Sequence, residues 1–257
     1  MFIPMYYAII QSLKPLDELW MYPPRFYVAN PTPQNFSDMF KAMTDSWVPF
    51  SRYIFNTVFI SVGGTFGNLV CGSLAAYAVS KIKFPGRAGL QKMVRLALMF
   101  HATVGSVVNF MTMSALHLID TYWAIIIPAC GSTLGMFLMM QFMESSVPDT
   151  VLESARLDGA SEIRTYWTIA MPMVKPAWLT LIVYSFQGLW QTGSSIYIMS
   201  EQYKTFNYAI SQIVSSGTAR AGVGMASAVV MMIVPVAVFV ITQSNIIETM
   251  STSGMKD

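Results

Sequence analysis

Five long runs without a charged residue constrain this sequence more than any other feature. They are Tyr53–Ser80, Leu96–Ile119, Thr121–Met143, Pro176–Ser200 and Ala221–Ile247. Each run is long enough to cross a membrane, because a spanning helix needs about 20 mostly apolar residues. Only 11% of the 257 residues are charged, whereas a typical soluble domain has about 25%. The sequence therefore predicts an all-α membrane protein.

A sixth apolar segment, Met1–Leu13, has only 13 residues. It lacks the basic beginning and the small-residue cleavage site of a signal peptide. We expect it to be the outer end of a first spanning helix whose beginning lies further upstream, which makes six spanning helices. The sequence has no tandem repeat and no low-complexity segment, so we expect a single transmembrane domain over residues 1–257.

The distribution of Lys and Arg predicts which connections face the cytoplasm. Segment 81–95 has five basic residues and no acidic one. Together with 144–175 and the C-terminal tail, it gives nine basic residues on one side against six on the other. The positive-inside rule therefore places both termini in the cytoplasm. The segment 14–52, which contains several prolines, is expected to lie outside as an extended, turn-rich loop.

Residue types that carry out chemistry are scarce in this chain. No Gly-x-x-x-x-Gly-Lys sequence is present, so the chain has no phosphate-binding loop of its own. His101 and His117 have no carboxylate or cysteine at metal-ligand spacing, and we expect Cys71 and Cys130 to be small core residues. The net charge of +2 excludes a basic nucleic-acid-binding protein. We therefore expect no catalytic residues and no metal site.

Small residues at a spacing of four predict where helices approach each other closely. Gly63-x-x-x-Gly67 and Gly131-x-x-x-Gly135 each place two glycines on one helix face. We expect these pairs to serve packing within the helix bundle.

The segment 144–175 contains the most informative pattern. It has 32 residues, of which five are acidic and three are basic. Ser146 followed by Asp149 predicts a helix cap, with a helix over 150–158 that stops at Gly159. A second helix over 160–170 is expected to lead to Pro172 and Pro176, which end it before the next span. Spacing alone is consistent with either a docking surface or an amphipathic connector.

Within this segment, Glu153-Ser154-Ala155-x-x-x-Gly159 is followed after nine residues by Ile169-x-Met171-Pro172. The pattern resembles the EAA loop of binding-protein-dependent ABC importer permeases, with Ser and Met in place of the family's Ala and Leu. The form that includes Asp158 is similar to that of the carbohydrate (MalG-like) subfamily. By this resemblance, the residues that couple the chain to an ATPase are Glu153, Ser154, Ala155, Asp158, Gly159, Ile169 and Pro172.

The resemblance implies a six-helix ABC importer permease in the bacterial cytoplasmic (inner) membrane. The chain would pair with a second homologous permease subunit to form the channel. Two cytoplasmic ABC ATPase subunits would bind ATP and Mg²⁺, and an extracytoplasmic solute-binding protein would deliver a sugar or oligosaccharide. The chain itself would be non-catalytic and would bind no cofactor. The alternative is a channel or secondary carrier that works alone, although no charged residue lies in the middle of a run, as ion-coupled carriers usually require.

A polar stripe in the run 176–200 is the candidate substrate path. Its members are spaced by three and four residues, so they are expected to share one helical face. Burying amide groups in hydrocarbon without partners costs several kcal/mol, so this face should avoid lipid. We expect it either to line a water-filled cavity or to form hydrogen bonds to another helix. The candidate residues are Tyr184, Gln187, Gln191 and Ser194, the nearby Trp190, and Asn109 in another run, for which the same alternatives apply.

Overall fold

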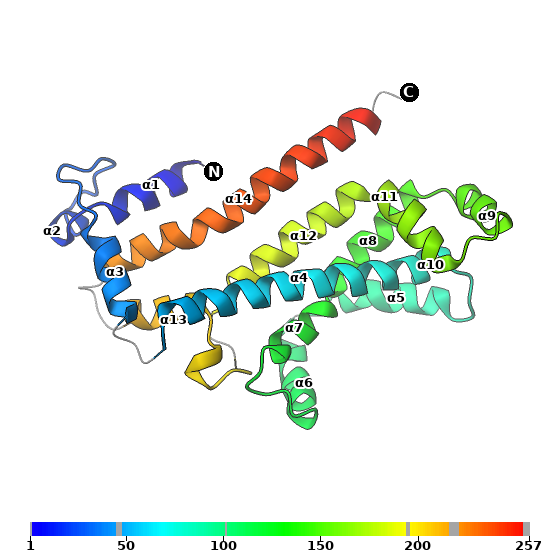
Figure 1. Ribbon diagram of the computed structural model, residues 1–257, viewed down its shortest axis with the longest axis horizontal. Coiled ribbons are helices and arrows are strands. Elements are labelled where there is room, and N and C mark those ends of the chain that lie inside the picture. Colours follow the sequence, from blue (N-terminus) through cyan, green and yellow to red (C-terminus); the bar gives the residue numbers. More distant parts are fainter. Residues whose placement is uncertain (1, 45–47, 101, 194–195, 216–220, 254–257) are drawn as a thin grey trace. The chain divides into compact units, whose positions relative to one another are not determined.

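The computed structural model describes residues 2–44, 48–100, 102–193, 196–215 and 221–253, and all regular structure in these ranges is helical (Figure 1). This confirms the predicted all-α class. The elements are α1 (Phe2–Ser12), α2 (Leu16–Leu19), α3 (Gln34–Thr44), α4 (Phe50–Lys81), α5 (Arg87–Ala97), α6 (Ala102–Ala115), α7 (Trp123–Cys130), α8 (Thr133–Ser146), α9 (Asp149–Leu157), α10 (Glu162–Thr165), the π-helix η1 (Tyr166–Ala170), α11 (Met171–Met173), α12 (Lys175–Trp190), the 3-10 helix η2 (Glu201–Tyr203), α13 (Phe206–Ser215) and α14 (Ala221–Ser253).

Among the described residues, three helical segments are long and apolar enough to cross a membrane. They are α4, the α7–α8 segment Trp123–Ser146, and Ala221–Gln243 of α14. A fourth candidate is the bent pair Glu162–Met173 and Lys175–Trp190, whose two parts meet at 84°. The run Leu96–Ile119 is not one continuous helix, because α5 ends at Ala97 and α6 begins at Ala102.

The contacts divide the chain into two compact units. One contains residues 1–59 and 190–238, and the other contains 60–189 and 239–257. We describe each unit by itself.

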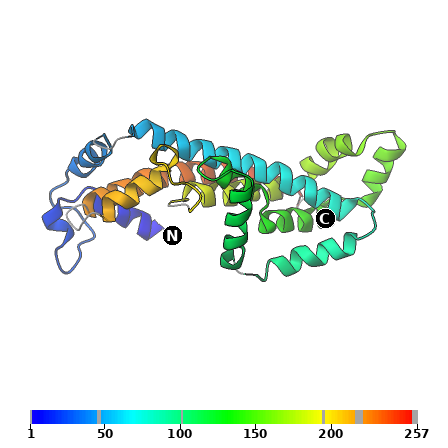
Figure 2. The same ribbon diagram turned by 90° about the horizontal axis from the view of Figure 1, so that it is seen from below.

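In the unit that contains residues 60–189, the core joins α4, α8, α9, η1 and α12. Its fully buried side chains include Met139, Leu152, Tyr166 and Leu181. α5 lies alongside the end of α4 (Figure 2), where Arg87 donates hydrogen bonds to the backbone oxygens of Val79 and Ser80. This core fixes the expected coupling segment to the end of a spanning helix.

Of the four glycines expected to serve packing, Gly63, Gly67 and Gly135 lie against another helix in this unit, whereas a side chain at Gly131 would meet only the backbone of Pro128. A side chain at Gly63 would approach Cδ1 of Ile126 at 3.3 Å, and one at Gly135 would approach Cδ1 of Leu181 at 2.8 Å. The absence of a side chain therefore allows close packing of α4 against α7 and of α8 against α12. Cys71, expected in a core, is exposed on the isolated chain instead.

In the unit that contains residues 1–59, the predicted outer loop is more ordered than its prolines indicate. The ammonium group of Lys14 is buried and donates to the backbone oxygen of Arg25 at 2.6 Å. The Glu18 carboxylate accepts from the backbone N–H of Ala29 at 2.9 Å, and Asn35 donates to two further backbone oxygens. Helices α2 and α3 lie within the loop, so it is a folded segment with an extended part between them.

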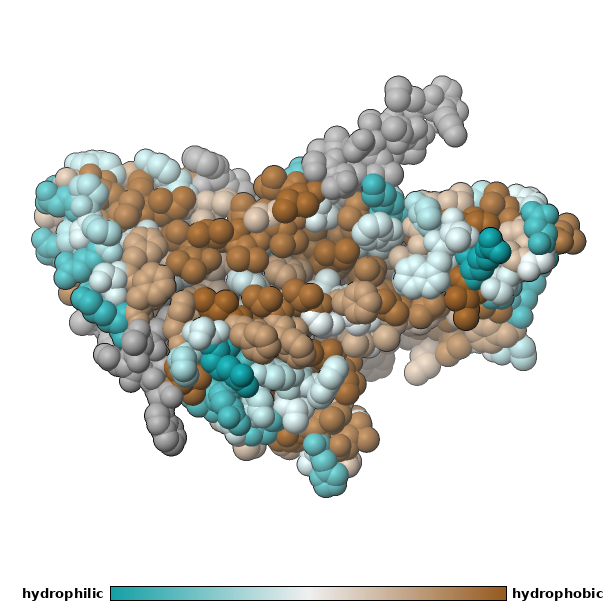
Figure 3. All heavy atoms as spheres, viewed as in Figure 1, coloured by the Kyte–Doolittle hydropathy of each residue, from teal (hydrophilic) through white to brown (hydrophobic). Residues whose placement is uncertain are grey.

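Apolar side chains cover much of the face drawn in Figure 3. The helices expose large apolar residues that a soluble protein would bury, among them Phe66, Val107 and Ile233, each more than half exposed. In α14, only 11% of the most apolar window is buried. Such surfaces are expected where helices face lipid or another membrane subunit.

Candidate functional site

The predicted coupling segment bends at Gly159, as expected. α9 ends at Leu157, and Gly159 has a φ of +79°, a value that glycine adopts without the steric cost of a side chain. The backbone N–H of Ala160 donates to the oxygen of Ala155 at 3.0 Å, which completes the end of the helix. A side chain at Gly159 would meet no atom within 4 Å, so the requirement for glycine is conformational.

One detail of this segment differs from the sequence prediction. The residue that precedes α9 is Pro148, which makes no side-chain cap, whereas Ser146 ends α8. The second helical stretch runs through Pro172 to Met173, and the chain turns at Val174. The end of this stretch therefore lies between Pro172 and Pro176, as expected.

The α9 helix has one buried face and one exposed face. Leu152 and Ala155 are buried against the core, whereas Leu157 is 90% exposed. Among the other residues assigned to coupling, Ile169 is partly buried, and the exposed ones are Glu153, Ser154, Asp158, Gly159 and Pro172.

An ion pair attaches the beginning of α9 to the C-terminal end of α4, which Figure 1 shows next to α9 and α10. The end of α9 is connected to α4 through Glu162 of α10. Near the beginning of α9, Nζ of Lys81 lies 2.8 Å from Oδ1 of Asp149, and this contact holds the pKa of Asp149 below its ordinary value. Near its end, Nε of Arg156 lies 2.7 Å from Oε1 of Glu162, and the hydroxyl of Tyr77 donates to Oε2 of Glu162 at 2.9 Å. The sequence analysis did not identify Lys81, Tyr77 or Glu162 as coupling residues.

We expect Asp149→Ala to destabilise the protein by about 1–3 kcal/mol, the usual cost of leaving a buried polar group without its partner. The Lys81 side chain is only 6% exposed, whereas that of Asp149 is 74% exposed, so the loss arises mainly at Lys81. Because the folded pKa of Asp149 is lowered, its contribution is present above about pH 4 and is lost as the pH falls further. Thermal unfolding of the purified protein measures the effect. Lys81→Met removes the charge and keeps an apolar stem, so it should cost less; equal losses would contradict this account.

In the other unit, the segment 201–206 is fixed to the beginning of α4. Asn56, which is fully buried, donates through Nδ2 to the backbone oxygens of Gln202 and Lys204 at 2.9 and 2.8 Å. The hydroxyl of Thr57 accepts from the backbone N–H of Phe206 at 2.8 Å. These contacts fix the chain that precedes α13.

We expect Asn56→Leu to release this segment, because leucine has a similar size but no donor for the two carbonyl groups. Each carbonyl left without a partner costs about 1–3 kcal/mol. Limited proteolysis should show faster cleavage near residue 203, while Ser51→Ala, a change at an exposed position, should leave the cleavage rate unchanged. An unchanged rate in Asn56→Leu would show that other contacts hold the segment.

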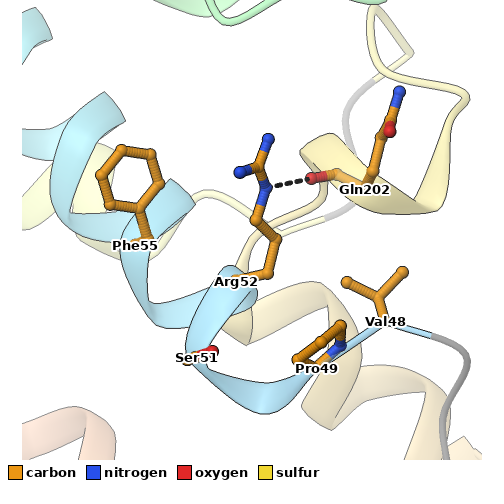
Figure 4. Close-up of a pocket in the computed structure, with 6 residues that line it drawn as sticks. All are labelled: Val48, Pro49, Ser51, Arg52, Phe55 and Gln202. Carbon is orange, nitrogen blue, oxygen red and sulfur yellow. Dashed lines mark hydrogen bonds between the residues drawn. The ribbon is translucent and has the colours of Figure 1, made fainter.

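A recess of about 650 Å³ lies beside the contacts between the beginning of α4 and segment 201–206. As Figure 4 shows, the Arg52 side chain reaches toward Gln202, and its Nε donates to the backbone oxygen of Gln202 at 3.4 Å. The Arg52 guanidinium also lies 5.8 Å from the ring centre of Phe55. The recess is an open surface with one cation, lined by Val48, Pro49, Ser51, Arg52, Phe55 and Gln202.

A second cavity, of about 440 Å³, is lined by α13, α14 and the end of α12. Trp190 and Gln191 line it, together with Asn207, which the sequence analysis missed. The Nδ2 group of Asn207 donates to the backbone oxygen of Gln191 at 2.6 Å, and the indole N–H of Trp190 donates to the oxygen of Met231 at 2.9 Å. The cavity thus combines an apolar wall with two amide side chains.

The predicted helical stripe does not continue to its end. α12 stops at Trp190, so Gln191 lies beyond the helix, and Ser194 lies outside the described residues. Tyr184 is 50% exposed and Gln187 is partly buried, and neither lines the cavity. Asn109 is exposed on α6.

The family of the chain is identified by its sequence. Residues 68–251 match the family described as binding-protein-dependent transport system inner membrane component. The chain belongs to this family. The matched region includes the whole coupling segment and most of the apolar helices.

Individual relatives cover most of the chain. It is 28% identical to the sn-glycerol-3-phosphate transport system permease protein UgpE of Yersinia enterocolitica, over 86% of this chain and 74% of UgpE. It is 24% identical to the inner membrane ABC transporter permease protein YcjP of Escherichia coli, over 98% of this chain and 90% of YcjP. The match to protein LplC of Bacillus subtilis is 31% identical, over 54% of this chain and 50% of LplC.

One solved structure has the same fold. It is described as a bacterial ABC transporter involved in the import of the acidic polysaccharide alginate. The superposition has a TM-score of 0.79 and covers 95% of this chain and 90% of that chain at 22% sequence identity. The all-helical architecture is therefore that of an ABC importer permease.

Proposed function

We propose that this chain is the permease subunit of a bacterial inner-membrane ABC importer for sugars or oligosaccharides. The observation that carries the proposal is the α9–α10 element, whose buried side joins the core and whose exposed side carries Glu153 and Leu157. Among the relatives, UgpE is named for glycerol phosphate transport, and the YtcP protein of Bacillus subtilis is named for polygalacturonan and rhamnogalacturonan transport. These names support carbohydrate-related substrates.

We assign six spanning helices to a single domain over residues 1–257, with both termini in the cytoplasm. The three candidate spans and α12 supply four of these helices. α1 and the α5–α6 region would supply the remaining two. In this topology, segment 144–175 is a cytoplasmic loop within the domain.

Four kinds of partner complete the transporter. A second homologous permease would cover part of the exposed apolar surface, and an extracytoplasmic solute-binding protein would deliver the substrate to the outer segments. Two ATPase subunits would bind ATP and Mg²⁺ and would carry out all of the catalysis. This chain would hold no cofactor.

Coupling then follows from the contacts of α9. An ATPase subunit would bind the exposed side of α9 and the neighbouring Ile163, which is 70% exposed. Its movement would pass to α4 through Lys81–Asp149 and Tyr77–Glu162, and to α12 through the bend at Val174.

The test is reconstitution of the chain into lipid vesicles with its permease partner, the ATPase subunits and the binding protein. A panel of neutral and acidic oligosaccharides is supplied outside. We expect uptake that requires both ATP and the binding protein. Uptake by this chain alone without ATP would instead support the stand-alone channel or carrier.

A further inference from the structure

The two cysteines of the chain come from different spans and lie close together in the unit that contains residues 60–189. Gly63, Gly67 and Cys71 are each four residues apart on α4, so they share one face of that helix. Ile126 and Cys130 share a face of α7 in the same way. A side chain at Gly63 would contact Ile126, and one at Gly67 would collide with the sulfur of Cys130. The Cys130 sulfur therefore rests on α4 at Gly67, one turn from Cys71.

The two thiol groups border the same space. The S–H of Cys130 donates to the backbone oxygen of Ile126 at 3.2 Å. Both cysteines line one cavity of about 350 Å³, and Cys71 is exposed. Because α4 and α7 belong to candidate spans, this opening faces lipid or another subunit, so the reagent must be small and membrane-permeant.

We propose that Cys71 and Cys130 form a modification site, a dithiol that a two-electron thiol oxidant converts into an intramolecular disulfide between α4 and α7. One thiolate attacks the oxidant, the second displaces the reduced oxidant from the first sulfur, and the S–S bond forms. A diazene such as diamide accepts the two electrons and two protons and leaves as the hydrazine. The sequence contains only these two cysteines, so no other disulfide within the chain competes.

The close approach at Gly67 makes this reaction possible. A disulfide requires the two Cα atoms to be about 4.4–6.8 Å apart, a separation that ordinary helix packing at 8–10 Å between axes rarely provides. A methyl group at Gly67 would push the Cys130 sulfur away from α4. Gly67→Ala should therefore slow disulfide formation several-fold.

The experiment treats native membranes that contain the assembled transporter with diamide and then blocks the remaining thiols with N-ethylmaleimide. Mass spectrometry of this chain should show a fall from two blocked cysteines to none, with the peptides of Cys71 and Cys130 joined, and dithiothreitol should reverse it. Gly89→Ala, where an added side chain meets nothing within 4 Å, should react at the wild-type rate. Two blocked thiols after oxidation, or disulfides only between separate copies of the chain, would overturn the proposal. So would equal rates in Gly67→Ala and Gly89→Ala.

Discussion

Replacing Gly159 with valine is expected to uncouple ATP hydrolysis from transport while the transporter still assembles in the membrane. The φ of +79° at Gly159 costs a residue with a side chain about 1–2 kcal/mol, and a β-branched residue is especially disfavoured there. The bend would relax, so the exposed sides of α9 and α10 would no longer fit one ATPase surface. A penalty of this size corresponds to about a 5–30-fold change in an equilibrium. We expect a loss of that order in ATPase stimulation by the binding protein.

The chain offers a matched control for this experiment. Gly86 also has a positive φ, +93°, and an added side chain there meets nothing within 4 Å. Gly86→Val therefore introduces similar strain before α5, away from the coupling segment, and should leave stimulation intact. Gly159→Asn should retain most of the coupling, because asparagine tolerates this conformation. If the two valine variants lost stimulation equally, general strain would explain the result.

The bend at Gly159 was predictable because a glycine that ends a helix is a local signal, readable from neighbouring residues. The partners of α9 were not predictable, since Lys81 and Asp149 are 68 positions apart in the sequence. Only the core that packs α9 against α4 brings them together. Local spacing can identify a coupling helix, but it cannot identify the contacts that transmit its movement.

The ends of the helices were also only partly predictable from the sequence. The charge-free run 176–200 predicts one continuous span, yet α12 ends at Trp190. Gly193 follows shortly after this end and is a recognisable stop signal, which a count of charges does not detect. The interruption between α5 and α6 falls near Leu98–Phe100, where neither glycine nor proline occurs. Local sequence signals therefore do not predict this break.

Removing the Gln191 side chain is expected to slow oligosaccharide uptake about tenfold while the transporter still assembles. Gln191 and Asn207 supply amide groups to a cavity that is otherwise largely apolar, and uncharged amides suit the hydroxyl groups of a sugar. Loss of one such hydrogen bond costs about 0.5–1.5 kcal/mol, and 1.4 kcal/mol corresponds to a factor of ten. Uptake by Gln191→Ala in reconstituted vesicles measures the effect. Tyr184→Phe is the control, because Tyr184 does not line this cavity.

Chemical labelling distinguishes a substrate path from helix packing at the same position. Gln191→Cys is made in a chain whose native cysteines, Cys71 and Cys130, are replaced by serine, and a water-soluble thiol reagent is applied. A wet cavity on the sugar path predicts labelling that substrate slows. If position 191 stays unlabelled in every nucleotide state and Gln191→Ala transports normally, the amides of Gln191 and Asn207 serve packing, because a side chain that meets the sugar must also meet water.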